Sequence, residues 1–253
     1  MKHLLFFPIA LLFSFNIYAQ TESEIFKKKA FSNQYLLKKE LKGDLTKYDF
    51  SKLLLHTDNS VIYGFIGDNY QRIRVKIIRI TKDSLSSDTY NVFGKTMVKS
   101  NIDNFNGTIK ITDILKLKNI SYGVDDEYKN KAIKGEYVIL ADYNFFENKA
   151  QPHSGTFNGV LESDFYLDKN YKVQYDDIEM NSDGYTNNQF VGRWISYTDH
   201  ISKRCNWGDF RIPNSGDLDI GASEFSPDAK YSKYGWQSIR DKNDKIEEAK
   251  WWE

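Results

Sequence analysis

The residues with the clearest chemical potential lie near the C-terminus, in a stretch rich in glycine and turn residues. The candidate ligand-binding side chains in it are Trp207, Asp209, Arg211, Asp217, Asp219 and Glu224. Asp217 and Asp219 are two residues apart, so in an extended segment their carboxylates point to the same side. Together with Glu224 they offer the hard oxygen ligands that Ca²⁺ prefers. Asp side chains also cap their own backbone in loops, and we favour this interpretation, so neither a metal nor a cofactor is predicted.

Hydrolysis of glycosidic bonds is a second chemistry that acidic residues support. The reaction needs two carboxyl groups about 5 to 9 Å apart across a cleft. Asp209 with Glu224, and Asp176 with Glu179, are candidate pairs. A chain with 35 acidic residues supplies such pairs by chance. Aromatic residues that stack on sugar rings are also the residues that strands favour. A carbohydrate-active hydrolase is therefore the alternative hypothesis and not the first.

Motifs of several well-known chemistries are absent from the sequence. It contains no Gly-x-Ser-x-Gly elbow, no phosphate-binding glycine loop, no His-Glu-x-x-His and no paired-cysteine metal site. His56, His153 and His200 lie on separate segments. Cys205 is the sole cysteine, so no intramolecular disulfide forms, and we expect its thiol to be buried, the alternatives being a catalytic thiol and an intermolecular crosslink. These absences favour a binding protein over an enzyme.

The segments that must position these residues follow a hydrophobic period of two from about residue 53 onwards. Apolar and basic residues alternate strictly over 72–77, which is typical of a strand with one buried face. Ile77-Ile78 breaks the phase and predicts a bulge. We expect the basic side chains of this strand to form a solvated face, the alternative being a grip on an anionic ligand. They are Arg72, Arg74, Lys76 and Arg79. Further strands are predicted around 108–112, 137–143, 157–167 and 173–180.

A weak repeat indicates how these strands are arranged. Phe105-Asn106-Gly107-Thr108-Ile109, Phe157-Asn158-Gly159-Val160-Leu161 and Phe190-Val191-Gly192-Arg193-Trp194 share an aromatic–x–Gly–x–apolar core. A glycine just inside a strand allows a bend or a close approach, and repeated around a sheet it favours closure. We predict a mainly β fold, an antiparallel meander of about eight to ten strands. An up-and-down barrel is the first choice and a β-sandwich the second. Gly192-Arg193-Trp194 also matches the Gly-x-Trp triplet of lipocalins, which in that family lies on the first strand.

Three further segments complete the predicted domain. Thr21 and Glu24 fit a capping box, and apolar residues at helical spacing predict a helix over about 21–42 that ends at Gly43. Residues 199–235 are predicted to be a long ordered loop region with room for two short strands, and loops of this length are often functional. The charged tail from 241 to 253 is expected to dock on the domain through its two terminal tryptophans.

The first nineteen residues predict a secretory signal peptide. Lys2 is followed by an apolar run, and Ala19 offers the small residue that a signal peptidase needs. The alternative is a membrane anchor, but the run is shorter than the about 20 residues needed to span a bilayer. Residues 20–253 then form a single β-rich domain. Without Lys2 it carries 34 basic against 35 acidic residues, which is no electrostatic footprint for nucleic acid.

Four segments resemble a known group of proteins. They are Tyr18-Ala19-Gln20, Tyr63-Gly64-Phe65-Ile66-Gly67, Phe105-Asn106-Gly107-Thr108, and the loop from Asn206-Trp207-Gly208-Asp209 to Asp217-Leu218-Asp219. In these the chain resembles exported β-rich, barrel-like proteins of Bacteroidetes-type bacteria, a group with no established activity. The resemblance covers roughly a third of the chain. It implies export and a β-rich fold, and it transfers no site residue.

The sequence therefore predicts an exported, periplasmic or extracellular, non-enzymatic binding or interaction protein. Its partner would be a small molecule, a glycan or a protein, with no nucleic acid and no membrane span after signal cleavage. The inner face of the barrel or the loop over 199–235 would contact the ligand.

Overall fold

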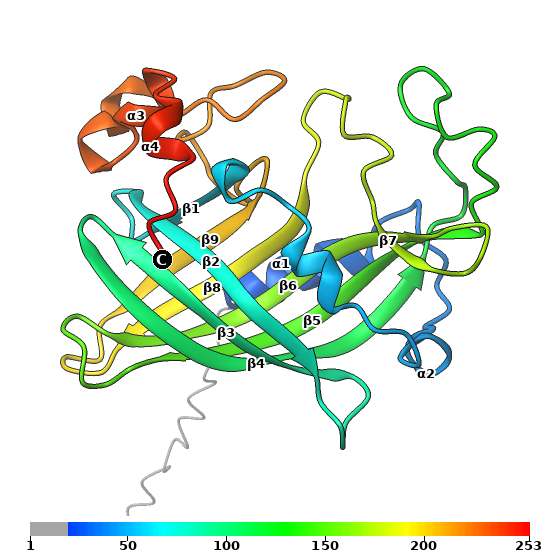
Figure 1. The fold of residues 1–253 in the computed structure, drawn as a ribbon, viewed down its shortest axis with the longest axis horizontal. Helices are drawn as coiled ribbons and strands as arrows, with labels where there is room; N and C mark the ends of the chain where they lie inside the picture. Colours follow the sequence, from blue (N-terminus) through cyan, green and yellow to red (C-terminus); the bar gives the residue numbers. More distant parts are fainter. Residues whose placement is uncertain (1–19) are drawn as a thin grey trace, which may run out of the picture.

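A closed β-barrel forms the body of the protein. The computed structural model describes residues 20–253, and the predicted signal peptide at 1–19 lies outside them. The strands of the described chain are β1 (Ile62–Ile66), β2 (Gln71–Lys82), β3 (Thr89–Val98), β4 (Asn101–Lys116), β5 (Gly135–Glu147), β6 (Gly155–Leu167), β7 (Val173–Tyr175), β8 (Asn187–Ser196) and β9 (Ser202–Asp209). All except β7 pair in the circular order β1-β2-β3-β4-β5-β6-β8-β9 and back to β1 (Figure 1). Every pairing is antiparallel. The predicted mainly β fold and up-and-down barrel are confirmed.

Bulges keep the apolar side chains of the longest strands facing inwards. The β2–β3 register shifts between Ile77 and Arg79, where the sequence predicted a bulge. Because of the extra residue, Ile80 continues the buried face at 6% exposure, whereas Ile78 points outwards at 38%. The predicted strand over 173–180 is shorter than expected, because β7 ends at Tyr175 and the chain then turns.

The repeated glycines lie where strands and aromatic rings approach closely. A Cβ atom on Gly107 would lie 2.0 Å from the carbonyl oxygen of Asn144. A Cβ on Gly159 or Gly192 would lie 2.8 or 2.3 Å from the hydroxyl oxygen of Tyr143. Such distances leave no room for a side chain. The glycines therefore make space for the aromatic interior, as the repeat predicted.

The N-terminal helix is shorter than predicted. Helix α1 spans Glu22–Phe31 and begins with the predicted capping box, in which Thr21 accepts from the backbone N–H of Glu24. The prediction of a helix to about 42 is wrong. Beyond α1 the chain runs along the end of β4, where the N–H of Leu37 donates to Lys116 and that of Leu41 to Ile114. The strand β3 does not reach this part of β4, so the chain covers an otherwise open strand edge.

One end of the barrel is closed by the segment that precedes β1. It contains α2 (Lys42–Leu45) and the 3₁₀ helices η1 (Ser51–Leu55) and η2 (Asn59–Val61). Phe50 and Leu53 are buried in the main hydrophobic core with exposures of 4% and 3%. We call this segment, residues 42–61, the plug. The backbone N–H of Phe50 donates to the hydroxyl of Tyr90 at 3.0 Å, which fixes the plug to β3.

The predicted loop over 199–235 contains the strand that closes the barrel. Residues 202–209 form β9, which pairs with β8 and β1, so the prediction of a loop there is wrong. Its Cys205 is fully buried, as expected. The irregular chain after Asp209 leads to η3 (Ala229–Tyr234), α3 (Gln237–Arg240) and α4 (Asp244–Glu247). Within residues 20–253, no helix has the length and apolar character needed to cross a membrane.

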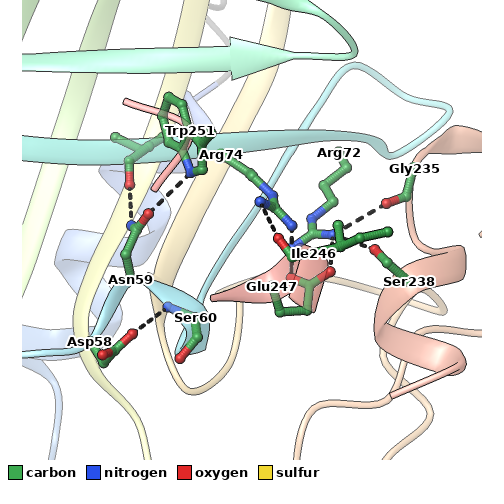
Figure 2. Close-up of polar contacts among 11 residues, drawn as sticks. Asp58, Asn59, Ser60, Arg72, Arg74, Gly235, Ser238, Ile246, Glu247 and Trp251 are labelled. Carbon is green, nitrogen blue, oxygen red and sulfur yellow. Dashed lines mark hydrogen bonds and ion pairs between the residues drawn. The ribbon is translucent and has the colours of Figure 1, made fainter. Parts of the chain in front are cut away.

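The chain after Asp209, residues 210–253, covers the outer face of β1 and β2, and we call it the C-terminal segment. Its apolar side chains form a small core around Trp236, and their barrel partner is Phe65. Arg72 and Arg74 of β2 point out of the barrel, yet they are only 7% and 8% exposed, so the prediction of a solvated basic face is wrong for these two. Both donate to the carboxylate of Glu247 in α4 (Figure 2). The segment replaces solvent over these charges.

The last residues dock beside the arginines, as expected for the tail. The indole N–H of Trp251 donates to the side chain of Asn59 at 3.2 Å (Figure 2). The ammonium of Lys76 lies 4.8 Å from the ring centre of Trp252. These contacts tie the end of the chain to η2 and to β2.

Candidate functional site

The end of the barrel opposite the plug is open and contains a cavity of about 790 Å³. The turns after β1, β3, β5 and β8, which contribute to its lining, gather at the left of Figure 1. Its lining residues come from the ends of the strands and from these turns. They are Ile66, Gly67, Asp68, Asn69, Gln71, Ile73, Thr96, Val98, Lys99, Ser100, Asn101, Asp103, Glu147, His153, Phe157, Trp194, Ile201, Ser202 and Lys203. We call this cavity the mouth.

The interior between the mouth and the plug is filled with aromatic rings. Phe190 and Trp207 stack with ring centres 4.5 Å apart, and Tyr143 contacts both edge-on at 5.3 Å. Phe105 and Phe145 stack at 4.9 Å in the same layer. Because these rings occupy the middle of the barrel, the mouth is a cup with a solid base.

The floor of this cup is apolar. Ile73, Phe157 and Ile66 line it and are 1%, 2% and 8% exposed. Val98 and Trp194 add further apolar surface to the walls. Cavities of this size, with apolar walls and a few convergent polar groups, are the usual form of a small-molecule site.

Glu147 is the most firmly held polar group of the mouth. One carboxylate oxygen accepts from the hydroxyl of Thr96 at 2.6 Å. The other accepts from the indole N–H of Trp194 at 2.9 Å and from the backbone N–H of Gly155 at 2.8 Å. Burial raises the pKa of Glu147, an effect that these three hydrogen bonds oppose and the nearby Asp103 charge reinforces. Glu147 thus joins β3, β5, β6 and β8 at the base of the cavity.

Asp103 is the least satisfied polar group of the mouth. It is 4% exposed, and its Oδ2 accepts from the side-chain amide of Asn101 at 2.5 Å. Its Oδ1 is buried and has no hydrogen-bond partner within residues 20–253. Burial raises the pKa of Asp103, while the Asn101 hydrogen bond and the nearby His153 lower it. A carboxylate oxygen without a donor at this depth is costly.

The turn beside Asp103 is fixed in place. The backbone N–H of Asn104 donates to the side chain of Gln151, whose amide donates in turn to the carbonyl of Ile102, each at 3.0 Å. Asn101 also donates to the carbonyl of Pro152. The turn between β5 and β6 is therefore bound to the start of β4, and the wall next to Asp103 is ordered by several contacts.

The six side chains singled out from the sequence do not meet at one site. Trp207 is part of the aromatic layer, and Asp209 lies at the plugged end. There Asp209 accepts from Thr57, Tyr175 and Asn188, and burial raises its pKa to about 6. Both residues support the barrel from inside.

The other four lie on the outside, in the chain after β9. Arg211 forms an ion pair with Asp219 at 2.8 Å and donates to the carbonyl of Gly221, so this pair clamps a loop. Asp217 accepts from the exposed Lys230. Glu224 is exposed beside a second, outer groove of about 670 Å³. Asp219 caps its own loop, because its Oδ1 accepts from the backbone N–H groups of Gly221 and Ser226, whereas Asp217 is held by side chains, those of Lys230 and Tyr231.

The carboxylate pairs proposed for hydrolysis are also not placed across the mouth. Asp209 is sealed at the plugged end, whereas Glu224 is on the outer loop. Asp176 and Glu179 follow β7, at the end of the barrel remote from the mouth, where burial raises the pKa of Asp176 to about 6. Within the described chain, no group of three or more His, Cys, Asp or Glu side chains is arranged to hold a metal ion.

The sequence reasoning did not select Asp103 or Glu147. Asp103 lies two residues before Phe105 on the inward phase of β4, and Glu147 two residues after Phe145 on that of β5. A charged residue among the inward-facing positions of a strand could have indicated this site from the sequence. That signal is usable only when it is already known which face of the strand points into the barrel.

The fold and the mouth together define an eight-stranded up-and-down barrel with one open, partly apolar end. A comparison of the chain with protein-family models, curated proteins and solved structures found no match.

Proposed function

We propose that this protein is a non-enzymatic binding protein that holds a small, partly apolar organic molecule in the mouth. The observation that carries the proposal is the cavity of about 790 Å³ above the apolar floor of Ile66, Ile73 and Phe157. The mouths of β-barrels are a preferred place for such ligands. The proposal includes export, as the first nineteen residues predict, so the ligand would be met outside the cytoplasm.

A titration with N-phenyl-1-naphthylamine, a dye without charge at neutral pH, tests this proposal. Its fluorescence rises on transfer from water to an apolar cavity, and Trp194 in the mouth supplies a second signal through its own emission. We expect saturable binding of one dye per chain. Val98→Trp should weaken it at least about tenfold by filling the mouth. Ile220→Trp, on the outer loop, is the matched control and should bind as the parent does. Equal binding by both variants would place the dye elsewhere and refute the proposal.

One observation favours the hydrolase as a second candidate. Glu147 pairs with Phe105 across β4 and β5, so Asp103 is its diagonal neighbour on the inward face, a pair of positions that lie about 7–8 Å apart in an antiparallel sheet. Two carboxyl groups on such positions are able to reach the separation of glycosidase carboxyl pairs. However, the oxygens of Glu147 already accept from three protein donors, which leaves it poorly placed to act on a substrate.

A panel of nitrophenyl glycosides separates the two candidates. Release of nitrophenol by the parent protein, lost in Asp103→Asn and in Glu147→Gln, would favour the hydrolase. Binding of the dye without release of nitrophenol from any member of the panel would favour the binding protein.

A further inference from the structure

The mouth holds two buried carboxyl groups, and neither forms an ion pair with a basic side chain of residues 20–253. Asp103 and Glu147 are 4% and 5% exposed. Buried charges are normally paired, because removing a lone charge from water is expensive. A positively charged group that binds beside the two carboxyl groups would therefore be stabilised.

The two carboxyl groups differ in what they leave free. Both oxygens of Glu147 are occupied by protein donors. Asp103 has one oxygen bound to Asn101, while Oδ1 has no partner among residues 20–253. The free acceptor thus belongs to Asp103, on the inward face of β4 and in the lining of the cavity.

We infer that the mouth selects ligands that carry an ammonium or similar cationic donor, which binds Oδ1 of Asp103 while the apolar body lies on Phe157 and Ile73. This inference rests on the proposed function and names the ligand class. A cationic N–H satisfies the acceptor and the charge together, whereas a neutral hydroxyl satisfies only the acceptor. An anion would bring a further negative charge close to these two carboxyl groups.

The rim of the mouth contains basic residues that bear on the choice between cation and anion. Lys203 packs with its ammonium 5.5 Å from the ring centre of Trp194 and is directed to that ring. Lys99 and His153 are exposed in turns, where solvent screens their charge. The buried carboxylates act at short range in a less polar setting, so they outweigh the rim. If the protein binds an anionic probe more tightly than a cationic one, the rim outweighs the carboxylates and the inference is contradicted.

Three probes with the same phenyl body and nearly the same size test the inference: 2-phenylethylamine, 2-phenylethanol and phenylacetate. Each is titrated against the complex of the full-length mature protein with N-phenyl-1-naphthylamine at pH 8, and displacement of the dye is measured. We expect the amine to bind at least about tenfold more tightly than the alcohol. Phenylacetate should bind more weakly than the alcohol.

Two aspartate variants locate the effect. In Asp103→Asn the preference for amine over alcohol should fall to about twofold or less, while affinity for the alcohol stays near that of the parent. Asp68→Asn is the matched control, because Asp68 lines the same mouth but is exposed. Its preference should change by less than about twofold. Thermal unfolding of each variant verifies that it folds.

The outcomes separate this inference from the proposed function. If the dye binds and the alcohol displaces it, but the amine shows no advantage, the binding function stands and the cation inference is overturned. An advantage that survives in Asp103→Asn overturns it as well, and the parent comparison remains decisive if that variant does not fold. If the dye does not bind the parent protein, the proposed function itself fails.

Discussion

Replacing Glu247 by alanine should loosen the C-terminal segment from the barrel. Glu247 is the shared acidic partner of Arg72 and Arg74: Arg72 donates to both carboxylate oxygens, at 2.9 and 2.5 Å, and Arg74 donates to one of them at 2.9 Å. The side chains of the two arginines are 8% and 10% exposed, and that of Glu247 is 12% exposed. Without the carboxylate, two buried guanidinium groups face each other with no counter-charge. Figure 2 shows that their remaining acceptors, at Gly235, Ser238 and Ile246, are uncharged.

The magnitude follows from the burial of this triad. Removing one partner of a buried ion pair costs about 3–5 kcal/mol. We expect the lower end, about 3 kcal/mol, because both arginines keep carbonyl acceptors. The segment can also detach and return both arginines to water, so the cost appears as easier opening of residues 229–253. A loss of 3 kcal/mol corresponds to about a hundredfold rise in the open population.

Native-state hydrogen exchange of residues 229–253 measures this opening directly. Amides of η3, α3 and α4 should exchange about a hundred times faster in Glu247→Ala, while those of β5 and β6 keep their protection. Asp217→Asn is the control, because the Asp217–Lys230 pair is about half exposed on both sides, so its loss should leave the exchange rates nearly unchanged. The reasoning is refuted if the two variants show the same exchange rates in this segment.

Three further outcomes are expected. Gly192→Ala should destabilise the protein by at least about 2 kcal/mol in urea unfolding, because its Cβ would lie 2.3 Å from the Tyr143 hydroxyl. Gly43→Ala is the control, because no atom lies within 4 Å of the added Cβ, and it should change stability by less than about 1 kcal/mol. Equal losses of stability in the two variants would contradict the packing argument. Burial raises the pKa of Glu136 from 4.5 to about 7, so the folded state holds a proton that the unfolded state has lost between these values. Stability should therefore be greatest below about pH 4.5 as far as this group is concerned, and fall by up to about 3 kcal/mol, at about 1.4 kcal/mol per pKa unit, as pH rises through 7. Glu136→Gln should remove that slope, and a slope unchanged in the variant would assign it to other groups. Cys205 should resist a thiol reagent in the native protein and react only on unfolding, because it is fully buried and burial raises its pKa; rapid labelling of the native protein would contradict its place inside the barrel.

The barrel was predictable from the sequence because its main signals are local. The alternation in β2 and the broken phase at Ile77-Ile78 are visible without any knowledge of neighbouring strands. The length of α1 was not, because apolar residues after Phe31 have helical spacing but pack on the end of β4 in an extended chain. A tertiary contact overrode a local pattern.

The strand β9 was missed because its outer face is polar for a reason outside the strand. Arg204 and Asn206 both donate to Glu22 of α1, so polar residues alternate with only two apolar ones, Cys205 and Trp207. The composition of these residues is that of a loop unless it is known that α1 covers the polar face. From composition alone, a loop and a barrel strand covered in this way could not be distinguished.

The candidate site depended on information that the sequence does not carry. The distance between Asp103 and Glu147 is set by the pairing of β4 with β5 and by which end of the barrel remains open. The residues chosen for their density of charge instead proved to be spread over the interior, the plugged end and an outer loop.

The plug formed by Phe50 and Leu53 gives the barrel a direction. Because one end is closed and aromatic rings fill the middle, a ligand could enter and leave the barrel only through the mouth. A molecule longer than the cup must leave its remainder in solvent. Such a chamber can grasp the terminal group of a larger chain, but it cannot thread that chain from one side of the barrel to the other.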